Sequence, residues 1–126
     1  MARQRLLEAQ KLISMAMEEL GDSPTSNNIK IELWLSELCE SNGITPDRLK
    51  SSSRKNNLVD LRMIFCANAR KHGATLKDIG YMLGGRDHST VIHAIRQYYN
   101  ILETDPKFNG LAKRMEALAR EIYMSE

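Results

Sequence analysis

The residues best suited to chemistry lie in one uninterrupted run of the chain. Arg86, Asp87, His88, Ser89 and Thr90 are five consecutive side chains that can donate or accept hydrogen bonds. A helix that starts at this point needs one such side chain as its cap. The run therefore supplies more polar groups than local structure requires.

A catalytic use of this run is excluded by its spacing. Asp87, His88 and Ser89 are the residue types of a hydrolase triad, but neighbours at a helix start point about 100° apart and cannot form a hydrogen-bonded relay. His88 and His93 are about 140° apart around a helix, which makes them poor joint metal ligands without a third group. We predict no catalytic residues, no metal and no cofactor, and we do not expect an enzyme.

The elements that position these residues are predicted to be helices only. The 126 residues are 42% hydrophobic and 27% charged, which is enough to bury one core. Apolar residues recur at three-and-four spacing, and no segment alternates as a strand does. We expect an all-α, compact helical bundle with an extra N-terminal amphipathic helix. The expected helices cover 4–20, a segment after the connector 22–28 that ends at Gly43, 46–50, 56 or 57 to before Gly73, 75–83, 88 onward, and 106 onward.

Helix starts and core residues follow from the same pattern. The expected N-caps are Thr45, Thr75, Asp87 and Asp105. The last helix is expected to bury Phe108, Leu111, Met115, Leu118 and Ile122. Cys39 and Cys66 lie in apolar-periodic segments, which favours reduced, buried thiols over a disulfide.

Two of these helices have the sizes and order of a helix-turn-helix unit. A helix over 75–83, a break at 84–87 and a second helix from His88 match that unit. Its second helix places its first turn in the major groove of DNA, where the surplus polar groups of 86–90 meet base edges and phosphates. The alternative is an ordinary solvated helix start in which Thr90 assists the cap.

The basic residues are unevenly distributed. Residues 51–75 carry a surplus of positive charge, whereas the rest of the chain is nearly neutral. A local cationic patch is what phosphate binding needs, because each neutralised phosphate releases counterions. A solvated helix face is the alternative. The basic residues of the segment are Arg54, Lys55, Arg62, Arg70 and Lys71, against Asp60.

The run LKDIGYMLGGRDHSTVIHAIRQ, residues 76–97, resembles the signature of the C-terminal DNA-binding domain of the bacterial replication initiator DnaA. SSSRKNNLVDLR, residues 51–62, resembles that family's basic loop and the helix after it. The resemblance extends over about residues 29–122. It implies a helix-turn-helix domain that binds double-stranded DNA.

The resemblance also implies roles for residues that read bases. Arg54 aligns with the arginine that family members insert into the minor groove, and a guanidinium suits that narrow, negative groove. Asp87, His88 and Ser89 fall on the major-groove readers, with Thr90 beside them. These side chains can pair with base edges, and a Thr methyl can touch a thymine methyl.

The remaining implied contacts are to the DNA backbone. Lys55 belongs to the same basic loop as the minor-groove arginine, and Arg62 aligns with a phosphate-contacting arginine. Arg86 and His93 resemble backbone-contacting positions, and Lys77 adds a phosphate contact. These assignments complete the predicted DNA-binding set.

Three departures from the family pattern affect the predicted sequence preference more than the binding mode. Met63 stands where the family usually has glutamine, and Ser89 replaces the commoner threonine. The loop at Gly73 and Ala74 is one residue shorter than in typical members.

The sequence contains no G-x-x-x-x-G-K-[ST] phosphate loop, so we expect no ATPase activity and no ATP-driven assembly.

The sequence thus predicts a two-part organisation. Residues 1–27 form an N-terminal helix and connector, and residues 28–126 form the DnaA-like DNA-binding domain. We expect a cytoplasmic protein without a membrane span, which binds box-like duplex DNA in replication initiation or its regulation. The N-terminal helix packs on the domain, pairs with a second copy as a homodimer, or holds a replication-protein partner. The alternative function is a protein-interaction module of the replication machinery that keeps the fold.

Overall fold

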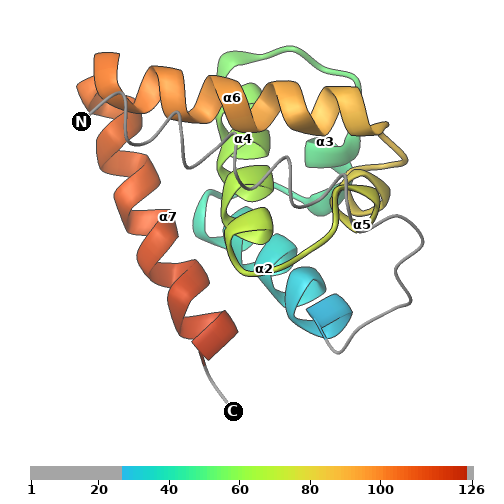
Figure 1. Ribbon diagram of the computed structural model, residues 1–126. Coiled ribbons are helices and arrows are strands. Elements are labelled where there is room, and N and C mark those ends of the chain that lie inside the picture. Colours follow the sequence, from blue (N-terminus) through green and yellow to red (C-terminus); the bar gives the residue numbers. More distant parts are fainter. Residues whose placement is uncertain (1–26, 125–126) are drawn as a thin grey trace.

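The computed structural model describes residues 27–124, which form a bundle of helices (Figure 1). Six helices and no strand occur in this range, which confirms the all-α prediction. The helix predicted over 4–20 and residues 22–26 of the predicted connector fall outside the described residues. The connector was predicted to continue to residue 28, which is wrong, because Asn27 and Asn28 already form the start of α2. The division of the chain into two parts at residue 27 stays a prediction. The helices are α2 (Asn27–Ser41), α3 (Pro46–Lys50), α4 (Asn56–Lys71), α5 (Leu76–Met82), α6 (His88–Thr104) and α7 (Pro106–Met124).

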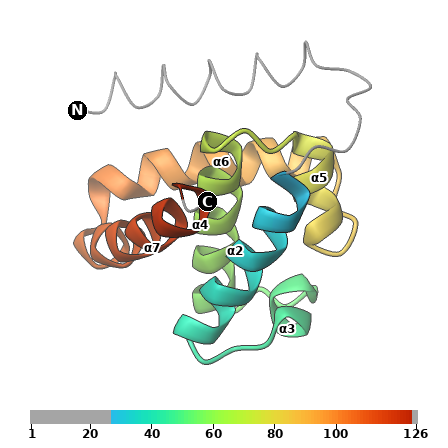
Figure 2. The same ribbon diagram turned by 90° about the horizontal axis from the view of Figure 1, so that it is seen from below.

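Helix α4 is the centre of the bundle. It contacts all five other described helices, and α6 lies across it (Figure 1). Seen from the other direction, α2 runs alongside α4 (Figure 2). The fully buried Trp34 of α2 donates its indole N–H to the Phe65 carbonyl at 3.2 Å and stacks on the Phe65 ring. This contact fixes α2 against α4, so that α4 can support the other helices.

The predicted helix caps are present in the structure. Each cap side chain accepts a hydrogen bond from a backbone N–H of the first turn, which satisfies a donor that the helix itself leaves unpaired. The bonds are Arg48 N to Thr45 Oγ1 (3.2 Å), Asp78 N to Thr75 Oγ1 (3.1 Å), Thr90 N to Asp87 Oδ1 (2.9 Å) and Lys107 N to Asp105 Oδ1 (3.0 Å). Four helix starts are therefore set by local sequence.

The predicted core face of α7 is only partly correct. Phe108 and Met115 are buried as expected. The predicted residues Leu111, Leu118 and Ile122 are only partly buried, whereas their neighbours Ala112, Ala119 and Tyr123 are buried. The helix is therefore rotated by about one position from the predicted face, so that two alanine side chains face the core.

The turn between α5 and α6 depends on glycine. Gly84 and Gly85 have φ angles of +84° and +87°, a region that side chains with a Cβ rarely adopt. The Gly80 carbonyl accepts hydrogen bonds from the N–H groups of Gly85 (3.0 Å) and Arg86 (2.9 Å). A Cβ at Gly80 would lie only 2.0 Å from the Arg86 carbonyl oxygen. The turn is therefore tight, and it brings the start of α6 close to α5.

The predicted cationic patch is smaller than the sequence count suggests. Arg70 is only 3% exposed, and its Nη1 donates to the Ala74 carbonyl at 2.6 Å. The buried Arg70 guanidinium therefore holds the loop before α5 by this hydrogen bond and is not available at the surface. Arg62 is half-buried. The cations of this segment that stay exposed are Arg54, Lys55 and Lys71.

The two cysteines are free and buried, as predicted. Burial raises the pKa of the Cys39 thiol to about 11 and that of the Cys66 thiol to about 12. Both thiols are therefore protonated at neutral pH and have little nucleophilic character. None of the helices in the part of the chain that the structure describes is long and apolar enough to cross a membrane.

Candidate nucleic-acid interface

The start of α6 presents polar side chains to solvent. Asp87, His88, Ser89 and Thr90 are all exposed. Asp87 Oδ1 accepts hydrogen bonds from the backbone N–H of Thr90 at 2.9 Å and from the Thr90 hydroxyl at 3.0 Å. These bonds, the backbone one first, lower the pKa of Asp87, so it is a carboxylate at neutral pH. Thr90 thus assists the cap, and the cap in turn fixes the orientation of the Asp87 carboxylate.

A groove of about 600 Å³ lies beside this helix start. It is formed by the loop before α4 and by the facing sides of α4 and α6. Five of the residues predicted to bind DNA line it together: Arg54, Arg62, Arg86, Thr90 and His93. The groove therefore brings the basic loop and the second helix of the helix-turn-helix, 30 to 40 positions apart in sequence, to one surface.

The loop that carries Arg54 is ordered by its serines. The Ser51 hydroxyl donates to the Arg48 carbonyl at 2.6 Å, and the N–H of Ser53 donates to the Ser51 hydroxyl oxygen at 3.4 Å. Arg54 and Lys55 follow with exposed side chains. The loop backbone is thus held while the two cations remain available.

Arg62 is hydrogen-bonded to the loop backbone rather than extended into solvent. Its guanidinium donates to the carbonyls of Leu49 (2.7 Å), Ser51 (2.7 Å) and Ser53 (2.6 Å). Burial and the neighbouring Arg86 charge lower the pKa of Arg62 from its usual value. Three of about five guanidinium N–H donors are used in this way. The phosphate contact predicted for Arg62 stays a prediction.

Arg86 also donates to backbone carbonyls of this segment. Its Nη2 donates to the Ser51 carbonyl at 2.7 Å, and its Nη1 donates to the carbonyls of Lys50 (3.2 Å) and Leu83. The side chain is half-buried. Arg86 therefore links the turn of the helix-turn-helix to the end of α3.

The other predicted residues do not line the groove, and all of them except Lys77 lie within two positions of a residue that does. Lys77 is exposed on the first turn of α5, after the Thr75 cap. Asp87, His88 and Ser89 precede Thr90 on the exposed tip of α6. Lys55 follows Arg54 in the loop. The surface thus consists of a groove with exposed polar residues at its rim.

Sequence reasoning overlooked Gln97, which also lines the groove. Gln97 lies four positions after His93 and seven after Thr90, so the three share one face of α6. That spacing was visible in the sequence. Met63, noted as a departure from the family pattern, is buried and contributes apolar surface to the groove floor.

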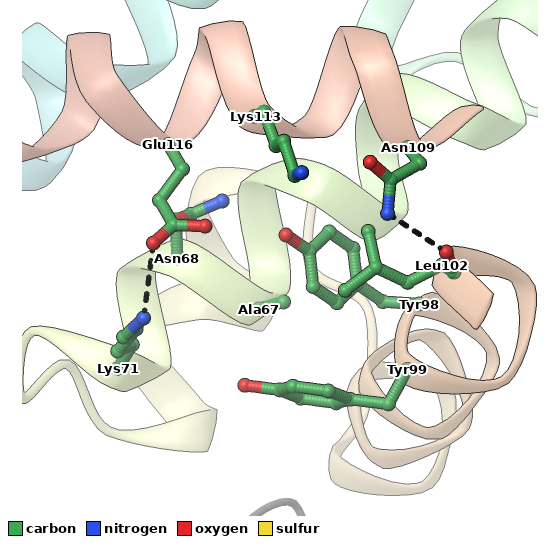
Figure 3. A pocket seen from close by; sticks show the side chains of 9 residues that line it. All are labelled: Ala67, Asn68, Lys71, Tyr98, Tyr99, Leu102, Asn109, Lys113 and Glu116. Carbon is green, nitrogen blue, oxygen red and sulfur yellow. Dashed lines mark hydrogen bonds and ion pairs between the residues drawn. The ribbon is translucent and has the colours of Figure 1, made fainter. Parts of the chain in front are cut away.

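A second, smaller pocket of about 130 Å³ lies between α4, α6 and α7 (Figure 3). Lys71 of α4 forms an ion pair with Glu116 of α7 at 3.3 Å, and Asn109 Nδ2 donates to the Leu102 carbonyl at 2.9 Å (Figure 3). These contacts join helices. Lys71 of the predicted cationic patch lines this pocket, where it is paired with Glu116, but no residue of the predicted DNA-binding set does.

The chemistry of the described residues gives no support to a metal site. Among residues 27–124, no group of three His, Cys, Asp or Glu side chains is placed to hold a metal ion.

A short helix, a glycine turn and a second helix with an exposed polar first turn define a helix-turn-helix domain. The family described as "Bacterial dnaA protein helix-turn-helix" matches residues 31–98. The match covers more than half of the chain, which belongs to this family. The helix-turn-helix domain of this family is a DNA-binding module.

The relatives of the chain are replication initiators. The chromosomal replication initiator protein DnaA of Wolbachia pipientis wMel is 35% identical over 109 residues, which cover 84% of this chain and 24% of the relative. The protein of the same name from Ureaplasma parvum serovar 3 is 42% identical over 76 residues, which cover 60% of this chain and 16% of the relative. This chain thus spans about a quarter or less of the relatives' length. No solved structure matches it significantly.

Proposed function

We propose that this chain binds duplex DNA sequence-specifically at sites like the box recognised by DnaA initiators, without ATPase activity, in replication initiation or its regulation in the cytoplasm. The start of α6 enters the major groove, and Arg54 enters the adjacent minor groove. The observation that carries the proposal is the exposed tip formed by Asp87, His88 and Ser89, beside a groove that Arg54 lines.

The α6 tip has the chemistry of direct base readout. The Asp87 carboxylate, oriented by its bonds to Thr90, can accept a hydrogen bond from a cytosine amine. His88 and Ser89 can donate to or accept from base edges, and the Thr90 methyl can contact a thymine methyl. Because the cap bonds already fix the Asp87 orientation, little conformational freedom is lost when it meets a base.

The cations around the tip supply the backbone contacts. The exposed side chains of Lys55 and Lys77 are available to contact phosphates, and His93 lines the groove itself. Arg62 and Arg86 add positive charge to the groove while their guanidiniums donate to backbone carbonyls. Three to five phosphate contacts give a salt dependence of log affinity with a slope of about −3 to −4.5.

The test is to measure the Kd of the full chain for a box duplex, a scrambled duplex and single-stranded DNA by fluorescence anisotropy at several salt concentrations. We expect a preference for the box duplex and the slope given above. His88→Ala should lose about 1–3 kcal/mol of discrimination between box and scrambled DNA. Arg54→Ala should weaken box binding. Arg114→Ala removes an exposed cation from α7, which does not line the groove, and should change neither quantity.

Two outcomes would contradict the proposal. Equal affinity for box and scrambled duplexes, or equal loss on both after His88→Ala, rules out direct readout by α6. Binding to a replication protein with little salt dependence, together with weak DNA binding, favours the protein-interaction module instead, because apolar helix pairing responds little to salt.

A further inference from the structure

Two arginines from different parts of the fold converge on a single backbone atom. Arg62 Nη2, from α4, and Arg86 Nη2, from the turn before α6, each donate to the Ser51 carbonyl oxygen at 2.7 Å. Ser51 is the residue that directly follows α3. Ser51, where the basic loop begins, is therefore hydrogen-bonded both to the long central helix α4 and to the turn of the helix-turn-helix.

The other bonds of the two guanidiniums extend this attachment along the loop. Arg62 reaches the carbonyls of Leu49 and Ser53, and Arg86 reaches that of Lys50. The Ser53 carbonyl belongs to the peptide group whose nitrogen is that of Arg54. The 2.6 Å bond from Arg62 to Ser53 thus fixes the peptide that carries the predicted minor-groove side chain.

The turn of the helix-turn-helix also packs directly on the end of α3. A Cβ built on Gly84 would lie 3.2 Å from the Lys50 carbonyl oxygen, so the two backbones are close. Arg86 follows two residues later and bonds to the same Lys50 carbonyl. The turn, the end of α3 and the loop are therefore packed against one another and joined by hydrogen bonds.

Charge alone does not explain why the two side chains lie together. Burial and then the Arg86 charge both disfavour the charged form of Arg62 and lower its pKa. Within the described part of the chain, both guanidiniums donate to backbone carbonyls. A guanidinium fork can hold several carbonyls in a fixed geometry, which a lysine ammonium does less well. The arrangement is suited to fixing a backbone.

We propose that Arg62 and Arg86 are positioning residues that hold the loop 51–55 at a fixed place relative to the start of α6, and so couple minor-groove binding by Arg54 to major-groove readout. The inference rests on the proposed function and deepens it. It differs from a direct phosphate contact by either arginine, because a phosphate contact acts independently of Arg54 and of DNA sequence.

The test is a double-mutant cycle with charge-preserving variants. Arg86→Lys and Arg62→Lys keep the positive charge but lose the fork, and each is made in the wild-type and Arg54→Ala backgrounds. In the wild-type background we expect each to reduce the ratio of box to scrambled affinity on the order of tenfold, with an unchanged salt slope. In the Arg54→Ala background we expect no further loss. Arg114→Lys, an exposed arginine of α7, is the matched control and should have no effect in either background.

A second measurement needs no DNA. Amide hydrogen exchange of residues 51–55 should be faster in Arg86→Lys than in the wild type, while exchange in the centre of α4 stays unchanged. Thermal unfolding followed by the fluorescence of Trp34, the single tryptophan, reports whether each variant folds.

The outcomes separate the inference from the function on which it rests. Four results would each overturn the positioning role while the wild type still prefers the box. They are additive losses in the cycle, equal losses on box and scrambled DNA, unchanged exchange in the loop, and variants that do not fold. A wild type that shows no preference for the box would overturn the proposed function, and the positioning role with it.

Discussion

Replacing Gly80 by alanine tests whether the tight α5–α6 turn places the recognition surface. Gly80 lies inside α5, and a Cβ there would be 2.0 Å from the Arg86 carbonyl oxygen. Real Cβ contacts essentially never fall below 3.0 Å, so the turn must move by about 1 Å. The Arg86 backbone cannot move freely, because its N–H donates to the Gly80 carbonyl at 2.9 Å and its side chain is bonded to Ser51.

The expected cost follows from two opposing effects. Overpacking of a tight contact costs about 1–3 kcal/mol. The better helix propensity of alanine returns about 0.5–1 kcal/mol. We expect Gly80→Ala to lower the free energy of unfolding by about 1–2 kcal/mol, which corresponds to a Tm lower by about 4–10 °C in a domain of this size. We also expect weaker box binding, because the start of α6 moves with the turn.

The control is Gly110→Ala in α7, where no heavy atom lies within 4 Å of the added Cβ. Only the propensity gain applies there, so this variant should be as stable as the wild type or more stable. Both variants are compared by urea denaturation and by DNA anisotropy. If Gly80→Ala were as stable as Gly110→Ala and bound the box normally, the argument that the turn is sterically fixed would be wrong.

Three further predictions concern the cap, a half-buried histidine and the core. Asp87→Ala should lower the Tm and Asp87→Asn should lower it much less, because Asn also caps helices. Since the pKa of Asp87 is lowered in the folded state, the advantage of the wild type over the alanine variant should persist above about pH 4 and fade as the pH falls through that pKa. Thermal melts at a series of pH values measure this. Burial first, then nearby cations, lower the pKa of His72, which stacks on Tyr123 at 4.5 Å. Stability should therefore fall as the pH drops below about 6.5, and His72→Phe should show a smaller fall between pH 7.5 and 5.5; equal slopes would exclude this role. Trp34→Ala should cost about 3–5 kcal/mol by urea denaturation followed by circular dichroism, and Trp34→Phe clearly less, because the ring that stacks on Phe65 is retained.

Local sequence determined the helix starts and the helix-turn-helix. The caps at Thr75 and Asp87 are hydrogen bonds to an N–H three residues away, so the pattern that predicts them also contains both partners. The apolar stripe of α6 is likewise a local pattern, since Val91, Ile95 and Leu102 recur with the period of one helix and are all buried. The signature over 76–97 identified the family because it describes the same local unit.

Tertiary structure decided how the arginines are used. Arg54, Arg62, Arg70 and Arg86 look alike in a charge count, yet only Arg54 is exposed. Arg86 bonds to a carbonyl 35 positions away, and no local pattern reveals such a partner. The rotation of α7, which buries Ala112 rather than its neighbour Leu111, also depends on the surfaces of the helices it packs against. Periodicity and caps arise from contacts within one helical turn, which the sequence contains, whereas the partner of a long side chain depends on which distant backbone the fold brings within its reach.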